Sequence, residues 1–154
     1  LGHGFPVAVG LALAAKKSQS RRRIFLITGD GELAEGSNWE AALAAAHYGL
    51  DNLVIINDKN NLQLAGPTRE IMNTDPLAEK WLAFGMQVTE CQGNDMASVV
   101  ATLEELKQEG KPNVVIAHTT KGAGISFIQG RAEWHHRVPK GDEIEQALEE
   151  LKDA

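Results

Sequence analysis

The segment from residue 24 to residue 66 most constrains the fold that this chain can adopt. Residues 24–28 (IFLIT) and 53–57 (LVIIN) are two short runs of apolar and β-branched residues. The first run ends at Gly29, Asp30 and Gly31, and the second ends at the polar residues 58–61. A short apolar run that stops at turn-forming residues is typical of a buried strand, so this segment predicts two strands.

The residues between these two runs predict a helix. Residues 37–48 are rich in alanine and precede Gly49, a residue that commonly ends helices. Ser37 and Glu40 have the spacing of a capping box at the start of such a helix. A strand, a helix and a strand of this length form a βαβ unit with parallel strands, so both turns open at the same edge of the sheet. Open α/β sheets bind their ligands at that edge.

The rest of the chain continues the alternation of helices and strands. Further strands are expected at residues 86–91 and 113–119, helices at 4–17, 75–84, 95–108 and 142–152, a polar loop at 67–74, and a glycine-rich turn at 121–124. Asp75 and Asp95 are expected to cap their helices. The predicted fold class is therefore α/β, with a parallel sheet covered by helices on both faces. We expect one domain over residues 1–154, incomplete at its N-terminus because the chain begins within a motif.

Composition excludes several classes of protein. Hydrophobic residues make up 43% and charged residues 23% of the 154 residues, as in ordinary globular proteins. The net charge of −6 argues against a nucleic-acid platform, so the basic stretch at residues 16–23 is interpreted as solvated surface. The single cysteine, Cys91, excludes an intrachain disulfide and favours a reducing, cytoplasmic compartment. No stretch approaches the roughly 18 apolar residues of a membrane span, so no membrane association is expected.

The two turns carry residues suited to a metal and a phosphate. Asp30 and Asn60 offer a carboxylate and an amide oxygen, which are hard ligands of the kind that Mg²⁺ prefers. Gly29 and Gly31 allow the backbone to approach a phosphate closely. Asp30 is expected in a turn outside the core.

This arrangement resembles a known cofactor motif. A Gly-Asp-Gly turn followed about thirty residues later by Asn60 and Asn61 resembles the diphosphate-binding motif of thiamine diphosphate enzymes. The surrounding residues are most similar to the transketolase family, and the resemblance extends over nearly the whole chain. Leu1-Gly2-His3-Gly4 resembles the end of that family's G-S/P-L-G-x-G loop, and Trp134-His135 resembles its late histidine segment.

The resemblance implies a thiamine diphosphate site with bound Mg²⁺, for which Ca²⁺ or Mn²⁺ can substitute. Its metal contacts fall on Asp30, Asn60 and the backbone carbonyl of Leu62. The cofactor-binding residues that it implies are Leu1, Gly2, His3, Gly29, Asp30, Gly31, Glu32, Asn60, Leu62, Lys121 and His135.

Three residues match positions that act in catalysis in the family. Glu35 and Glu40 match glutamates of a hydrogen-bonded network across the dimer interface. His135 matches a histidine near the diphosphate and the substrate, where an imidazole can donate a hydrogen bond or move a proton. His3 stands where the family often has glutamine, and His136 stands where glycine is common. His47 and His118 are interpreted as structural.

The family's reaction transfers a two-carbon glycolaldehyde unit from a ketose phosphate to an aldose phosphate. The residues that bind the aminopyrimidine ring and the activating glutamate lie on another domain, which implies a homodimer or a heterotetramer with a pyrimidine-domain subunit. Alternatives are an enzyme like deoxyxylulose-phosphate synthase or a dehydrogenase E1 subunit, or a non-catalytic cofactor-domain subunit. A dinucleotide-binding domain is improbable, because no G-x-G-x-x-G follows the first strand.

Overall fold

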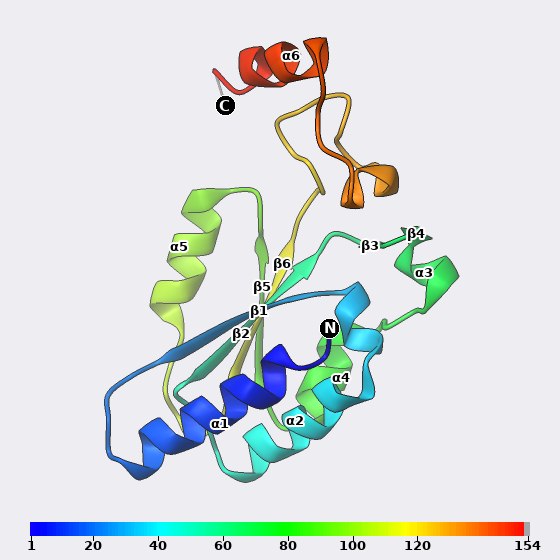
Figure 1. The fold of residues 1–154 in the computed structure, drawn as a ribbon. Coiled ribbons are helices and arrows are strands. Elements are labelled where there is room, and N and C mark those ends of the chain that lie inside the picture. The colour runs from blue at the N-terminus through cyan, green and yellow to red at the C-terminus, as the bar shows by residue number, and fades with distance from the viewer. Residues whose placement is uncertain (153–154) are drawn as a thin grey trace.

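The computed structural model of the chain describes residues 1–152, which fold around a four-stranded sheet (Figure 1). The strands are β1 (Ile24–Gly29), β2 (Leu53–Lys59), β5 (Gln87–Gln92) and β6 (Asn113–His118), in the spatial order β1-β2-β6-β5. Every pair of neighbouring strands is parallel. The predicted parallel sheet is therefore confirmed, and the ends of β1, β2 and β6 lie beside one another at one edge.

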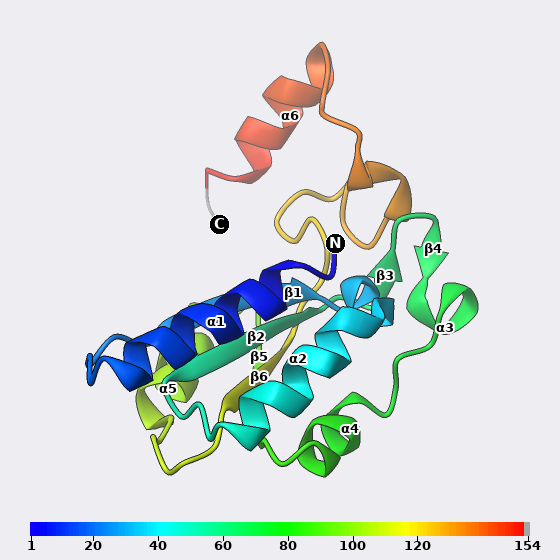
Figure 2. The same ribbon diagram turned by 60° about the horizontal axis from the view of Figure 1, so that its bottom comes forward.

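Helices cover both faces of the sheet (Figure 2). The larger core lies on the face that is covered by α1 (Gly4–Lys17), α2 (Gly36–His47) and α4 (Leu77–Ala83). A smaller core on the other face joins α5 (Met96–Glu105) to alternate residues of β2, β5 and β6. Successive residues of a strand point to opposite faces, so β2 contributes Leu53 and Ile55 to the first core and Val54 to the second. The predicted α/β class with helices on both faces is confirmed.

A cluster of aromatic side chains in the larger core fixes the helices relative to the site. Trp81 of α4 is fully buried, and its ring lies 6.0 Å from that of Phe5 and 4.9 Å from that of Trp39. Buried aromatic rings provide large apolar contact areas, so this cluster joins α1, α2 and α4 into one layer. The starts of α1 and α2 are thereby held close to the edge where β1 and β2 end.

Two predicted helix caps are wrong, and in both cases a distant partner takes the capping side chain. The helix α2 begins at Gly36 rather than Ser37, and the Ser37 hydroxyl donates to the carbonyl of Gly2 at 2.6 Å. Ser37 and Glu40 therefore form no capping box. Asp75 does not cap α4, because its carboxylate pairs with Lys59 at 2.6 Å.

Other predicted helix ends are confirmed. Asp95 caps α5 by accepting a hydrogen bond from the N–H of Ala97 at 2.9 Å. Gly49 follows α2 with a φ of +55°, as expected for a glycine that ends a helix.

The segment after β2 is more ordered than the sequence predicts. β3 (Leu62–Gln63) and β4 (Gly66–Pro67) pair as a short antiparallel hairpin, and α3 (Thr68–Ile71) occupies the first part of the predicted polar loop over residues 67–74, whose last residues, 72–74, have no regular structure. The N–H of Thr68 donates to the carbonyl of Asn61 at 3.0 Å, which folds the hairpin back on the end of β2.

The last helix is shorter than the sequence predicts. The short 3₁₀ helix η2 (Ala132–His135) precedes α6 (Asp142–Glu150), which ends before the predicted boundary at residue 152. Figures 1 and 2 both place α6 apart from the sheet and its covering helices. Among residues 1–152, no helix has the length and apolar character needed to cross a membrane.

Candidate functional site

A cleft of about 580 Å³ opens where the parallel strands end. The turns after β1 and β2, the residues after β6 and the η2 segment contribute to its walls. The residues that line it are Leu1, Gly29, Asp30, Gly31, Glu32, Asp58, Asn60, Leu62, Gln63, Leu64, Lys121, His135 and His136. Nine of the cofactor-binding residues implied by the sequence resemblance line the cleft. The fold therefore brings the first of these residues, Leu1, and the last, His135, to one place.

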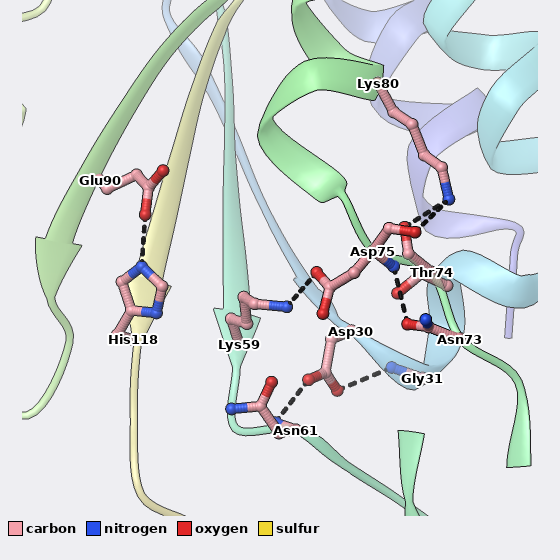
Figure 3. Close-up of polar contacts among 10 residues, drawn as sticks. All are labelled: Asp30, Gly31, Lys59, Asn61, Asn73, Thr74, Asp75, Lys80, Glu90 and His118. Carbon is pink, nitrogen blue, oxygen red and sulfur yellow. Dashed lines mark hydrogen bonds and ion pairs between the residues drawn. The ribbon is translucent and has the colours of Figure 1, made fainter. Parts of the chain in front are cut away.

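Asp30 lines this cleft, and its carboxylate is fixed by backbone N–H groups (Figure 3). One oxygen accepts the N–H of Gly31 at 2.8 Å, and the other accepts the N–H of Asn61 at 2.6 Å. Asp30 lies in the turn after β1, as expected, but it is only 1% exposed, so the expectation that it lies outside the buried interior is wrong. The two turns are thus joined through this single side chain.

The electrostatic environment of Asp30 favours a cation. Burial raises the pKa of Asp30 above the usual carboxyl value, although the N–H groups of Asn61 and Gly31 and the Lys59 ammonium oppose that rise. The nearby Asp58 carboxylate adds to the rise. A buried carboxylate whose charge is incompletely compensated is stabilised by a metal ion, so the environment of Asp30 fits a divalent cation.

Asn60 and Leu62 lie on the same wall of the cleft. The Asn60 amide oxygen accepts the N–H of Leu62 at 2.9 Å, and the amide nitrogen donates to Asp58 at 3.1 Å. Within residues 1–152 no group of three or more His, Cys, Asp and Glu side chains is arranged to hold a metal. The Asp30 carboxylate and the Asn60 amide oxygen are hard ligands of the kind that suits Mg²⁺ beside a phosphate, and the Leu62 carbonyl stays a predicted third ligand.

The N-terminal loop is clamped onto the 3₁₀ helix η1 (Gly31–Ala34), which follows β1, and onto the start of α2. The N–H of Gly2 donates to the Glu32 carboxylate at 3.0 Å, and its carbonyl accepts the hydroxyl of Ser37. Gly2 has a φ of +74°, and a Cβ atom there would lie 2.7 Å from both the Glu35 Cβ and the Ser37 Oγ. Only glycine fits this position, which explains the glycine in the loop. His3 is exposed, and its Nδ1 atom lies 2.9 Å from the carbonyl of Leu1.

Glu35 and Glu40 both lie at the start of α2. Glu35 occupies the N-cap position with an extended backbone, and both residues are exposed on this chain. Their predicted role in a network at a dimer interface stays a prediction.

The last wall of the cleft carries basic and imidazole side chains. Lys121 is half-buried in the turn after β6, whereas His135 and His136 are exposed and their rings meet edge to face at 4.7 Å. Partial desolvation lowers the pKa of His135 below the ordinary histidine value, and the nearby Lys121 and His136 act in the same direction. His135 is therefore neutral near pH 7 and can both donate and accept a hydrogen bond.

His118 serves a different part of the molecule. Its Nε2 atom lies 2.6 Å from the Glu90 carboxylate on the neighbouring strand (Figure 3). This pair lies outside the lining of the cleft, in agreement with a structural role.

The comparison with family models shows which family the chain belongs to. Residues 1–152 match the model described as "Transketolase, thiamine diphosphate binding domain". The chain belongs to this family. The membership confirms the resemblance found in the sequence and makes the chain a thiamine diphosphate-binding domain of the transketolase type.

Individual relatives agree with the family. A protein of Actinobacillus succinogenes named as one subunit of an apulose-4-phosphate transketolase is 74% identical over 99% of this chain and 55% of its own length. The 6-deoxy-6-sulfo-D-fructose transketolase subunit SqwG of Clostridium sp. is 39% identical over 99% of this chain and 56% of its own length. The chain thus spans about half the length of these curated relatives.

The solved structures show the same fold. The transketolase of Campylobacter jejuni matches with a TM-score of 0.91 at 32% identity, over 97% of this chain and 24% of that protein. The α/β domain described above is therefore one part of the larger architecture of that enzyme.

Some residues of the cleft are not predicted by the sequence. Asp58, Gln63 and Leu64 line the cleft, and the Thr119 hydroxyl donates a hydrogen bond to the Asp58 carboxylate. The position of Asp58 directly after the apolar run of β2 is a signal for it, because residues at the ends of parallel strands commonly face the ligand.

Proposed function

We propose that the cleft holds thiamine diphosphate through Mg²⁺, with Asp30, Asn60 and the Leu62 carbonyl as the ligands from the protein. The observation that carries this proposal is the meeting of a buried carboxylate and an amide oxygen from two adjacent strand ends. It occurs in a domain whose family binds thiamine diphosphate. Mn²⁺ or Ca²⁺, which also take oxygen ligands, are expected to substitute for Mg²⁺.

The residues of this chain would bind the cation, neutralise the charge of the diphosphate and contact the substrate. Thiamine diphosphate, when bound, supplies an electron sink for breaking a carbon–carbon bond beside a carbonyl. Asp30 and Asn60 fix the position of the cation, and the Lys121 ammonium offsets the negative charge of the diphosphate. His135, neutral near pH 7, donates a hydrogen bond to a substrate oxygen or exchanges a proton with it. The glycines of the turn after β1 let the backbone approach the diphosphate.

The proposed site needs a second domain to be complete. The cleft is open, and Glu35 and Glu40 present exposed carboxylates at the start of α2. Relatives that are named as single subunits of a transketolase support an assembly with another chain. We infer that these glutamates take part in the contact with the partner domain that binds the rest of the cofactor.

For the substrate, we propose a ketose phosphate that gives up a two-carbon unit to an aldose. Apulose 4-phosphate is the first ketose to test, because the relative that is 74% identical is named for it. The sulfonated sugar named for the relative that is 39% identical serves as the comparison.

The experiment assays the full-length protein together with its partner chain. We expect ketol transfer from apulose 4-phosphate that requires both thiamine diphosphate and a divalent cation and stops in excess EDTA. The same assembly carrying Asp30→Asn is expected to lose the transfer. Tight cofactor binding without transfer from any ketose phosphate would contradict the enzymatic proposal and leave a non-catalytic cofactor-binding subunit.

A further inference from the structure

A carboxylate next to the proposed metal site has no role in the function described so far. Asp58 lies near the end of β2, in register with Gly29 of β1 and Ala117 of β6. It lines the cleft beside Asn60 without being one of the expected ligands. We propose that Asp58, itself held by Thr119, fixes the orientation of the Asn60 amide and is a positioning residue for the metal. This inference rests on the proposed function.

Both oxygens of Asp58 are engaged by neighbouring side chains. One accepts the Asn60 amide nitrogen at 3.1 Å, and the other accepts the hydroxyl of Thr119. Thr119 directly follows β6, and its own N–H donates to the carbonyl of Lys59 at 3.2 Å. The threonine is therefore anchored by its backbone to β2, and its hydroxyl holds Asp58 from the side of the third strand.

The two neighbours of the Asn60 amide require the same orientation. An ionised carboxylate only accepts hydrogen bonds, so the side facing Asp58 must carry the amide nitrogen. A backbone N–H only donates, so the side facing Leu62 must carry the amide oxygen. A rotated amide would face oxygen with oxygen and N–H with N–H, and both hydrogen bonds would be lost. The amide oxygen, the atom that a cation requires, is thereby kept on the side of Leu62, the next proposed ligand.

This arrangement explains why an acid occupies position 58. An amide at this position could donate to Asn60 as well as accept from it, so only the Leu62 N–H would still oppose the rotated orientation of Asn60. Groups that orient metal ligands typically contribute 10- to 100-fold in metal affinity. The hydroxyl of Thr119 extends the same control by one further hydrogen bond, because it fixes the carboxylate that fixes the amide.

Thr119 gives the cleanest test because valine has its shape without its hydroxyl. Mg²⁺ is titrated by calorimetry into the full-length protein, assembled with its partner and supplied with thiamine diphosphate. We expect Thr119→Val to raise the Kd for Mg²⁺ about tenfold and Asp58→Asn about 10- to 100-fold. Thr119→Ser keeps the hydroxyl and is expected to bind Mg²⁺ like the wild type. The melting temperature in EDTA is measured for each variant, so that a loss of fold is distinguished from a loss of metal affinity.

The outcomes separate this inference from the proposed function. Wild-type Mg²⁺ affinity in Thr119→Val overturns the positioning role, and so does an equal loss in Thr119→Val and Thr119→Ser. A large loss in Asp58→Asn with none in Thr119→Val would make Asp58 a direct ligand instead. Asp30→Asn is included in the same titration. If that variant binds Mg²⁺ like the wild type, the proposed metal site itself is wrong.

Discussion

Asp30 contributes to the fold as well as to the proposed metal site, and the substitution Asp30→Asn separates the two contributions. Each carboxylate oxygen accepts one backbone N–H, from Gly31 and from Asn61. An asparagine has one oxygen, so one of these N–H groups would face the new NH₂ group. A buried donor left without a partner costs about 1–3 kcal/mol. In a domain of this size, 1 kcal/mol corresponds to about 2–4 °C, so the melting temperature without metal should fall by about 2–12 °C.

The response to the cofactor is expected to change more sharply. A ligand present at 100 times its Kd stabilises the folded state by about 2.7 kcal/mol, or about 5–11 °C on the same scale. The melting temperature of the wild type should rise by this amount when thiamine diphosphate and Mg²⁺ are added, and that of Asp30→Asn should not rise. Circular dichroism of the full-length protein, melted in EDTA and with both ligands, measures the two quantities.

A second aspartate provides the matched control. Asp51, which precedes β2 at its opposite end, also accepts a backbone N–H, from Gly110 at 3.1 Å, and pairs with Lys16. Asp51→Asn should lower the melting temperature but keep the full rise with the cofactor. If Asp30→Asn keeps that rise as well, Asp30 is not a ligand of the metal that binds the cofactor.

Two further predictions concern the N-terminal loop and His135. Gly2→Ala should destabilise the protein by at least about 1–2 kcal/mol, because its φ of +74° is costly for alanine and the Cβ would meet Glu35. Gly2→Ala should also weaken cofactor binding, measured by calorimetry. The control Gly10→Ala, where the added Cβ meets open space on α1, should bind the cofactor like the wild type. Equal cofactor affinity in the two variants would contradict the role of the clamped loop. His135→Ala should lower kcat/KM about 10²- to 10⁴-fold without changing the melting temperature, because the side chain is exposed. Because the pKa of His135 is lowered, its neutral form is favoured in the folded protein, so the activity of the wild type should fall only when the pH is below the ordinary histidine pKa of 6.5. Unchanged turnover in His135→Ala would make the residue structural.

The fold could be predicted because its strands are short apolar runs bounded by turns. The runs that form β1 and β2 are local features, and their parallel pairing follows from the helix between them. The same reasoning places Asp30 and Asn60 at one edge. It fails for Ser37 and Asp75, because each side chain has a partner elsewhere in the fold that competes successfully with its own helix. A capping pattern contains no information about such a competitor.

The unpredicted parts of the cleft have a similar origin. The hairpin of β3 and β4 is only two residues long on each side, and the hydrogen bond from Thr68 to Asn61 supports it rather than any periodicity. Asp58 and Thr119 are 61 positions apart, so only the pairing of β2 with β6 reveals that they touch. The burial of Asp30 is likewise set by the second turn folding over it.

The assembly of the cleft from three strand ends has a consequence for how the protein acquires its cofactor. Parallel strands pair through contacts between distant parts of the chain, which form late in folding. The wall that contains Asp58, held by Thr119, is complete only after β6 has joined β2. Thiamine diphosphate bound in this proposed site would therefore act on the finished sheet and not guide the early steps of folding. Its presence should slow unfolding while leaving the rate of folding nearly unchanged, so a shortage of the cofactor would shorten the lifetime of the folded protein without hindering its formation.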